Sequence, residues 1–418
     1  GFFVWSLTMK ATGFTTTIIH ADRQDGIEHG SLHKPVHHSV AFGYEDAHDL
    51  AAVFQGQIAG YSYGRQVNPT ANALERKLTK MERSVASVAF ATGMGAIGTA
   101  LFALLRSGDH FISSSFLFGN TNSLFNTFAT HDIDVTFVDA TDVENVRAAI
   151  QDNTRLVFVE TIGNPRTQVS DLERIGDLCG EHGLVYFVDN TVTTPYLFQP
   201  IDVGASFIIT SLTKYVGGHG NALGGMLTNT GLFDWSTFEN IYDAYKKGDR
   251  ATWGLTQIRK KGLRDFGASL GPDAAHQLAL GAETLALRME RACSNAQALA
   301  EFLDGHDAVK KVYYPGLKDH PQYPLCRKLF RYPGALLSFD LQDDIDCFSF
   351  MNRLDLTVLS SNLGDNRTLA IPVAHTIYYE MGLERRASMG IGESLIRIAV
   401  GIEDPEDLLG DYRQALSP

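Results

Sequence analysis

The middle of the sequence alternates short apolar runs with longer helical patterns, and this alternation constrains the fold more than any other feature. The apolar runs lie at residues 87–91, 110–113, 135–138, 156–160, 185–189 and 207–211, and helical patterns lie at 95–105, 142–150 and 171–182. Continuous apolar strands alternating with helices are typical of a mainly parallel sheet covered on both faces. Such sheets bind ligands at the carboxyl ends of their strands. The sequence therefore predicts an α/β fold with a ligand site at that edge.

Local signals support one of these helices in particular. Ser170 and Glu173 have the spacing of a capping box, in which each side chain accepts from a backbone N–H at the start of a helix. Gly183 follows the pattern at 171–182 and suits the left-handed position that ends a helix. We expect a helix with these two ends.

After about residue 265 the pattern becomes that of a smaller α+β domain. A long amphipathic pattern at 274–303 is followed by strand patterns at 312–314, 336–341, 357–359 and 395–400, with helices near 345–354 and 405–415. We predict an N-terminal arm at 9–70, a large domain at 71–265 and a C-terminal domain with a long linking helix at 266–418. We interpret residues 1–8, before Met9, as an expression or upstream-frame remnant.

Composition and charge exclude several classes of protein. The net charge is −13, which argues against nucleic acid or an anionic membrane as a partner. The densest basic run, at 259–261, is expected to be a solvated loop. The four cysteines are far apart, so we expect buried thiols in a reducing compartment, the cytoplasm. His33, His37, His38 and His219 have no carboxylate or cysteine at ligand spacing, and no metal site is expected.

The stretch Gly93 to Gly98 matches the dinucleotide motif GxGxxG between a strand and a helix. That motif requires an acidic residue at the end of the next strand, to bind the ribose. Here the next strand ends in Ser113-Ser114-Ser115, which speaks against a dinucleotide. Two other interpretations remain, a tight structural turn and a helix N-terminus whose backbone N–H groups bind a phosphate.

A carboxylate and an amine lie at the carboxyl ends of two neighbouring predicted strands. The first strand ends at Asp189, and the next ends at Ser211 and is followed by Leu212-Thr213-Lys214. Pyridoxal phosphate (PLP) needs a lysine for its Schiff base, a carboxylate that keeps the pyridine nitrogen protonated, and hydroxyls for its phosphate. A plain ion pair at the sheet edge is the alternative. The flanking hydroxyls and the helix start at Gly93 favour PLP.

These residues resemble motifs of the cystathionine γ-synthase-like (Cys/Met metabolism) family of PLP enzymes, over nearly the whole chain after Met9. The motifs are Tyr63-Gly64-Arg65, Asn68-Pro69-Thr70, Thr92-Gly93-Met94, Glu160 to Pro165, Val188 to Thr191, Ser211 to Lys214 and Leu395-Ile396-Arg397. Within the family, the stretches 263–270, 281–285 and 362–365 most resemble O-acetylhomoserine sulfhydrylases. The resemblance implies fold type I, the aspartate-aminotransferase type.

The resemblance also implies roles for single residues. Lys214 would form the Schiff base and then move protons, and Asp189 would pair with the pyridinium nitrogen. The implied cofactor-binding residues are Tyr63, Arg65, Gly93, Met94, Phe118, Asp189, Thr191, Ser211, Thr213 and Lys214, with the phosphate held by the Gly93 and Met94 amides and the Ser211 and Thr213 hydroxyls. Asn164, Asn362 and Arg397 would bind substrate, with Arg397 paired to its carboxylate.

Tyr63 and Arg65 are implied to reach the phosphate site of a neighbouring subunit. The resemblance therefore implies a homodimer as the smallest active unit and a homotetramer as the usual assembly.

The sequence departs from the family pattern at several positions. Phe118 stands where the family usually has tyrosine, so it can stack on the cofactor but has no hydroxyl to act as an acid or base. Asn120 replaces a common glycine, and Ser361 replaces the glutamate of cystathionine enzymes. The stretch 371–376 also differs from the family pattern. A carboxylate leaves more easily than a thiolate without a proton donor, so Phe118 fits an acyl-homoserine substrate better than a thioether.

The sequence analysis therefore predicts a PLP enzyme that exchanges the acyl group of an O-acyl-homoserine for sulfide or another thiol, giving homocysteine or methionine. Cystathionine γ-synthase and a methionine or cystathionine γ-lyase remain alternatives on the same scaffold. A nicotinamide-dependent oxidoreductase and a non-catalytic binding protein are alternatives from other classes. The expected partners are an amino-acid substrate and a thiol or sulfide, with no nucleic acid and no membrane.

Overall fold

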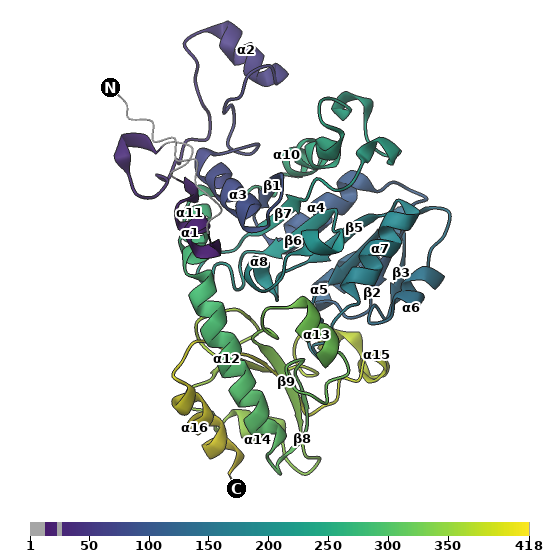
Figure 1. The fold of residues 1–418 in the computed structure, drawn as a ribbon, viewed down its shortest axis with the longest axis vertical. Coiled ribbons are helices and arrows are strands. Elements are labelled where there is room, and N and C mark those ends of the chain that lie inside the picture. The colour runs from purple at the N-terminus through teal and green to yellow at the C-terminus, as the bar shows by residue number, and fades with distance from the viewer. Residues whose placement is uncertain (1–12, 23–26, 418) are drawn as a thin grey trace.

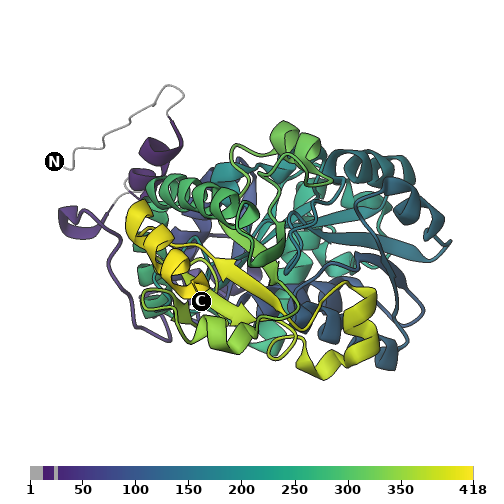
Figure 2. The same cartoon turned by 90° about the horizontal axis from the view of Figure 1, so that it is seen from below.

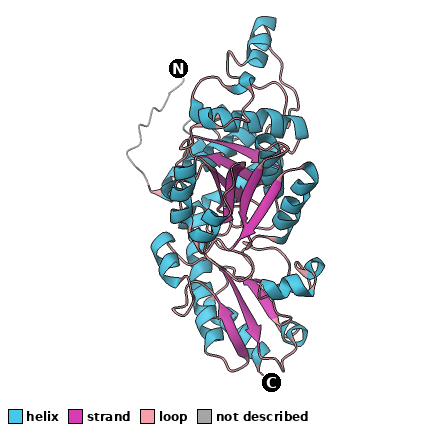
Figure 3. Ribbon diagram, turned by 90° about the vertical axis from the view of Figure 1, so that its right-hand side faces the viewer, coloured by secondary structure: helices cyan, strands magenta, loops and turns pink. Residues whose placement is uncertain are grey.

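The computed structural model describes residues 13–22 and 27–417, so the remnant expected at residues 1–8 lies outside the described part. Two sheets stand one above the other (Figure 3). The larger has the order β1-β7-β6-β5-β4-β2-β3. Its strands are β1 (Ala86–Phe90), β2 (His110–Ser114), β3 (Asp134–Val138), β4 (Thr154–Glu160), β5 (Val185–Asp189), β6 (Phe207–Ser211) and β7 (Gly225–Asn229). From β3 to β6 every neighbouring pair is parallel, whereas β7 runs antiparallel to both β6 and β1.

Helices cover both faces of this sheet (Figure 1). They include α3 (Pro69–Met81), α4 (Gly93–Leu104), α5 (Gly119–Phe128), α6 (Val143–Ala148), α7 (Leu172–His182) and α8 (Thr194–Leu197). Alternate strand residues enter opposite cores: Val157 and Val159 pack in one cluster, and Leu156 and Phe158 in the other. A strand buried on both faces has no polar face, which explains why these strands appear in the sequence as unbroken apolar runs.

The smaller sheet has the order β10-β11-β12-β9-β8 and is mostly antiparallel. Its strands are β8 (Val309–Tyr313), β9 (Leu336–Leu341), β10 (Val358–Leu359), β11 (Leu369–Pro372) and β12 (Leu395–Ala399). The helices here are α11 (Pro272–Glu283), α12 (Leu285–Asp304), α13 (Tyr323–Leu329), α14 (Cys347–Met351), α15 (Leu383–Ser388) and α16 (Pro405–Leu416). Figure 2 shows α16 alongside the long helix α12. The predicted domain boundaries stay predictions.

The remaining α-helices of the described chain are α1 (Phe14–Ile19), α2 (Ala47–Gln55), α9 (Trp253–Gln257) and α10 (Arg264–Phe266). Helix α2 projects away from both sheets and buries none of its residues (Figure 1). No helix in the described ranges combines the length and the apolar composition that crossing a bilayer requires.

The structure differs from the sequence-based predictions at several places. Strands β7 and β11 have no counterpart in the sequence analysis. The pattern at 274–303 is two helices, because Thr284 lies between α11 and α12. The capping box is wrong: Ser170 donates its hydroxyl to the Glu160 carbonyl instead, and Glu173 pairs with Lys328. Gly183 does end α7 in the left-handed conformation, with φ of 64°.

The basic run is also not a solvated loop. Residues Ile258–Leu263 form a π-helix that continues α9, and Ile258 and Leu263 are buried. The guanidinium of Arg259 reaches inward to the buried Glu75 carboxylate at 2.8 Å. Burial of the apolar residues on either side holds the run in a helix, and one of its charges is compensated inside the protein.

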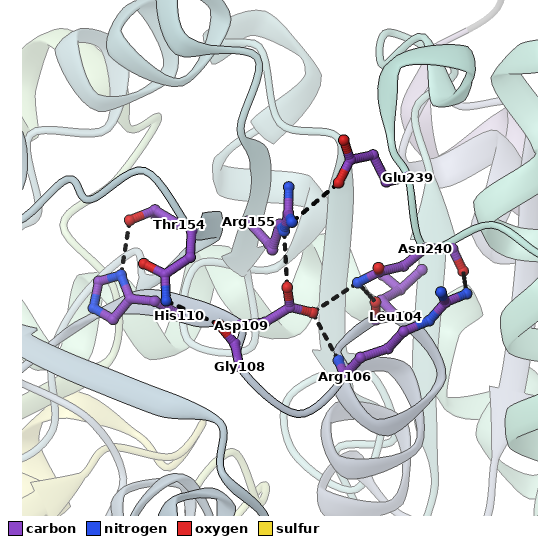
Figure 4. Close-up of polar contacts among 10 residues, drawn as sticks. Leu104, Arg106, Gly108, Asp109, His110, Thr154, Arg155, Glu239 and Asn240 are labelled. Atoms are coloured by element: carbon purple, nitrogen blue, oxygen red, sulfur yellow. Dashed lines mark hydrogen bonds and ion pairs between the residues drawn. The ribbon is translucent and has the colours of Figure 1, made fainter.

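The turn before β2 is organised by a buried carboxylate, Asp109 (Figure 4). It accepts from the Arg155 guanidinium at 2.8 Å, and from the Asn240 amide and the Arg106 backbone N–H at 2.7 Å each. Arg155 also reaches Glu239, at 3.2 Å. Asp109 therefore connects the start of β2 to β4 and to the segment around residue 240.

Replacing Asp109 with alanine should lower the free energy of unfolding by about 3 kcal/mol, because Arg155 and Asn240 lose a buried acceptor. Urea denaturation followed by circular dichroism measures this. The matched control is Asp243→Ala, since Asp243 is exposed and pairs with Lys246 on the surface. Equal midpoints for the two variants would contradict the structural role of Asp109.

Candidate active site

A cavity of about 390 Å³ opens at the carboxyl ends of the parallel strands, the edge that the sequence predicts. It is closed from the other side by residues that follow β10 and β11 and by β12. The cavity brings together ten of the predicted site residues: Gly93, Met94, Phe118, Asn164, Asp189, Thr191, Ser211, Lys214, Asn362 and Arg397.

Three predicted residues do not line this cavity. The Thr213 hydroxyl donates to the Gly224 carbonyl at 3.2 Å and accepts from the Gly224 N–H at 3.0 Å. Tyr63 is exposed, and the Arg65 guanidinium packs against the Tyr63 ring and donates to the Arg264 carbonyl. Within this chain Tyr63 and Arg65 therefore stand apart from the cavity.

Lys214 supplies a partly buried amine that is easily deprotonated. Its Nζ donates to Oδ1 of Asn362 at 2.7 Å, so an amide from the far side of the cavity orients it. Burial and, to a smaller extent, the charge of the Arg397 guanidinium together lower the pKa of Lys214 to about 8. An amine with such a pKa is partly uncharged near neutral pH and can act as a nucleophile or a base.

Asp189, which is partly buried, and Glu160, which is buried, form a pair of carboxyl groups at the cavity. They are register partners at the ends of β5 and β4. Burial raises the pKa of each, and in Glu160 the charge of Asp189 adds to that effect. Asp189 accepts from the Thr191 N–H at 2.9 Å, and Glu160 accepts from the Phe118 N–H at 2.8 Å. The pair creates a site at which a cationic group would be strongly stabilised.

The start of α4 faces the same cavity. Thr92 caps the helix by accepting from the Gly95 N–H at 2.9 Å. A Cβ at Gly93 would lie 2.9 Å from the Ser211 Cβ, so the backbone there can approach Ser211 only because residue 93 is glycine. The Thr191 hydroxyl accepts from the Ser211 N–H at 2.8 Å. Free helix N–H groups beside a serine hydroxyl suit an anion such as phosphate.

Arg397 is fully buried on β12. One of its terminal nitrogens donates to the carbonyls of Ser361 at 3.0 Å and Asn362 at 2.8 Å. Its Nε has no hydrogen-bond partner in the described chain, and the same is true of the buried Oδ1 of Asn164. Unpartnered buried polar atoms are costly, so both indicate a polar ligand in this cavity.

Several further residues lie at this cavity without a predicted role. Glu160 belongs to one of the family motifs and ends an apolar run next to the run that ends in Asp189. Ile377 lines the cavity, and the neighbouring Tyr378 is buried with its hydroxyl at the Asn164 carbonyl, 2.6 Å away. Nothing in the sequence near residue 377 indicates a site, because the chain folding alone brings it there.

Comparison with known proteins gives a consistent result. The family model described as "Cys/Met metabolism PLP-dependent enzyme" matches residues 15–417. L-methionine gamma-lyase of Fusobacterium nucleatum is 36% identical over 98% of this chain and 99% of its own. O-acetyl-L-homoserine sulfhydrylase of Corynebacterium glutamicum is 34% identical over 96% and 95%. The crystal structure of a Campylobacter jejuni protein, described as an O-acetylhomoserine (thiol)-lyase and carrying a pyridoxyl-lysine monophosphate, matches with TM-score 0.91 and 31% identity over 97% of this chain and 100% of its own.

Proposed function

The chain belongs to the family of Cys/Met metabolism PLP-dependent enzymes, and we propose that it replaces the acyl group of an O-acyl-homoserine with a sulfur nucleophile. As a member of this family it is a PLP enzyme of sulfur amino-acid metabolism. This excludes a nicotinamide-dependent oxidoreductase and a non-catalytic binding protein. The observation that carries the finer proposal is Phe118, a ring without a hydroxyl in the cavity that holds Lys214 and Arg397.

The residues of the cavity fit pyridoxal phosphate. The Lys214 amine can hold it covalently, and the Asp189 carboxyl can accept a hydrogen bond from its ring nitrogen. The α4 N-terminus at Gly93 and the hydroxyl of Ser211 suit its phosphate. The backbone at Gly93 lies so close to Ser211 that a Cβ at residue 93 would occupy the space between them. Phe118 can pack against its ring.

Bound PLP supplies an electron sink that makes the protons near the substrate's amino group removable. Lys214 then takes a proton from Cα and later returns one, and Asn362 keeps its Nζ oriented toward the cavity. The partly buried Asp189 carboxylate would keep the ring nitrogen protonated. Arg397 binds the substrate carboxylate with the Nε that has no partner in the described structure, while its other nitrogen stays fixed on Ser361 and Asn362.

The nature of the leaving group decides between reactions. A carboxylate departs without a proton, whereas a thiolate is a stronger base and gains more from a nearby acid. Phe118 provides no acid, so the cavity favours an acyl leaving group over a thioether.

The γ-lyase reaction is the second candidate, because several relatives named L-methionine gamma-lyase are 33–37% identical over nearly the whole chain. The two reactions use the same cofactor residues. They differ in whether a sulfur nucleophile adds before the product is released.

The test is to incubate the purified holoenzyme with O-acetylhomoserine, with and without sulfide, and separately with methionine. The proposal predicts homocysteine and acetate that depend on sulfide. Ammonia and a 2-oxo acid formed from methionine without any added thiol would instead identify a γ-lyase.

We also propose a homodimer as the smallest active unit, with Tyr63 and Arg65 completing the neighbouring subunit's phosphate site. The proposal is supported by their exposure and their separation from this chain's own cavity. A homotetramer made of two such dimers is the expected assembly.

The rate at which PLP attaches to the apoprotein should rise with pH and level off above a midpoint near pH 8. The lowered pKa of Lys214, about 8, sets this midpoint, since only the uncharged amine reacts and its share falls tenfold per pH unit below the midpoint. Stopped-flow absorbance measures the rate, with N-acetyl-lysine amide as the control amine. A midpoint above pH 10, as for an ordinary lysine, would contradict the assigned environment.

A further inference from the structure

The first turn of helix α5 opens into the cavity without a capping side chain. Phe118 occupies the N-cap position and makes no side-chain capping hydrogen bond. Its own N–H is taken by Glu160, but the N–H groups of Gly119, Asn120 and Thr121 donate no hydrogen bond to any described residue. Phe118, Asn120 and Thr121 all line the cavity. The helix therefore presents uncompensated donors to whatever binds there.

Two buried side chains of the same cavity point independently to a polar ligand. Asn164, 3% exposed, has an Oδ1 without a partner in the described structure, and Arg397, 1% exposed, has an unpartnered Nε. Arg397 suits the substrate carboxylate, so the rest of the substrate must extend from there past Lys214 toward the remaining lining residues.

Among those residues Asn120 is the free polar group. Thr121 is buried and donates its hydroxyl toward the Met94 sulfur, 3.7 Å away. Ser361 lies on the Arg397 side, where its carbonyl accepts from the guanidinium. Asn120 is exposed at the cavity, and its side chain makes no hydrogen bond within the described ranges. Its amide can donate to an oxygen without giving up another contact.

The departure of the acyl group creates an anion in need of such donors. When the Cγ–O bond breaks, both bonding electrons stay on the acyl oxygen and the group leaves as a carboxylate. The electrons that form the new bond between Cβ and Cγ come from the Cβ–H bond, and the proton passes to the Lys214 amine after that amine has given up the proton it took from Cα. No proton is delivered to the leaving oxygen, so hydrogen bonds and a helix N-terminus stabilise its charge.

We propose that Asn120 and the first turn of α5 bind the acyl group of the substrate and stabilise it as it leaves as a carboxylate. The inference rests on the proposed function and extends it. It makes Asn120 a specificity-determining residue for substrates whose leaving group ends in oxygen.

The test compares Asn120→Asp and Asn120→Ala with the control Asn126→Asp. Asn126 is exposed on the same helix but does not line the cavity, so the control adds the same charge elsewhere. We expect kcat/KM for O-acetylhomoserine with sulfide to fall about 100-fold in Asn120→Asp, about tenfold in Asn120→Ala, and less than twofold in Asn126→Asp.

A second measurement uses L-norvaline, which has no leaving group. Exchange of its Cα proton in D₂O should stay within twofold in all three variants. Equilibrium dialysis of labelled acetate against holoenzyme saturated with L-norvaline should show at least tenfold weaker binding in Asn120→Asp, a smaller loss in Asn120→Ala and no loss in Asn126→Asp.

The outcomes separate the two proposals. A wild-type protein that exchanges the Cα proton but does not turn over O-acetylhomoserine refutes the proposed function. A wild-type protein that does both, while Asn120→Asp matches Asn126→Asp in turnover and acetate binding, overturns the role of Asn120. Loss of Cα exchange together with turnover in Asn120→Asp also overturns it, because the effect would then not be on the leaving group.

Discussion

Replacing Lys214 with alanine should abolish covalent attachment of PLP and lower the rate of homocysteine formation by at least about 10²–10⁴-fold. This range is the loss expected from removing a positioned general base alone, and the loss of covalent attachment adds to it. Lys214 is the one amine among the residues that line the cavity in the described structure. Borohydride reduction followed by peptide mapping measures the attachment site, and a product assay measures the rate.

The control is Lys318→Ala, which removes an exposed amine elsewhere in the chain. That variant should keep the visible absorbance and the labelled peptide of the wild type. Lys214→Ala should still fold, because it removes a charge that burial makes unfavourable. Label found on a different lysine of the wild-type protein would contradict the assignment.

The large sheet could be predicted because its strands are buried on both faces. Runs such as Leu156–Glu160 and Val185–Asp189 have no polar side to interrupt them, so their positions follow from hydrophobicity alone. The carboxyl edge then follows from the parallel order. The α/β, fold type I architecture expected from the resemblance is confirmed by the sheet and by the match to solved family members.

Strands β7 and β11, which the sequence pattern does not predict, lack such unbroken apolar runs. Strand β7 begins with Gly225 and ends with Asn229, and it enters the sheet antiparallel between β1 and β6. Strand β11 is four residues long and ends in Pro372. Each is defined by its neighbours in the sheet, whose pairing is not encoded in the local pattern.

The site residues likewise include some that the strand pattern predicts and some that it does not. Asp189 and Lys214 could be predicted to share a site because Asp189 ends β5 and Lys214 comes shortly after the end of the neighbouring β6. The same reasoning applied to Glu160, at the end of β4, predicts the pair of carboxyl groups. The hydrogen bond between Lys214 and Asn362 joins residues 148 positions apart, and the chain between them passes from the first sheet into the second. Only the resemblance, and not any spacing, placed Asn362 and Arg397 at the site.

Replacing Asp189 with asparagine should weaken PLP binding at least tenfold and lower the rate of Cα proton exchange by about 10²–10³-fold. Asparagine fits the same space but carries no charge, so the ring nitrogen would lose the anion that we propose keeps it protonated. The size of the loss corresponds to removing one preorganised electrostatic contact from a buried site. Fluorescence titration of the apoprotein measures PLP affinity, and NMR in D₂O measures exchange of the L-norvaline Cα proton.

The decisive comparison is Glu160→Gln, at the register partner of Asp189. Glutamine keeps an oxygen that can accept from the Phe118 N–H, now held at 2.8 Å by Glu160, and removes only the charge. If Asp189 alone contacts the ring nitrogen, Glu160→Gln should change both quantities less than tenfold. Equal losses in the two variants would mean that the carboxyl groups act as one shared charge, and near-wild-type behaviour of Asp189→Asn would remove Asp189 from the cofactor site.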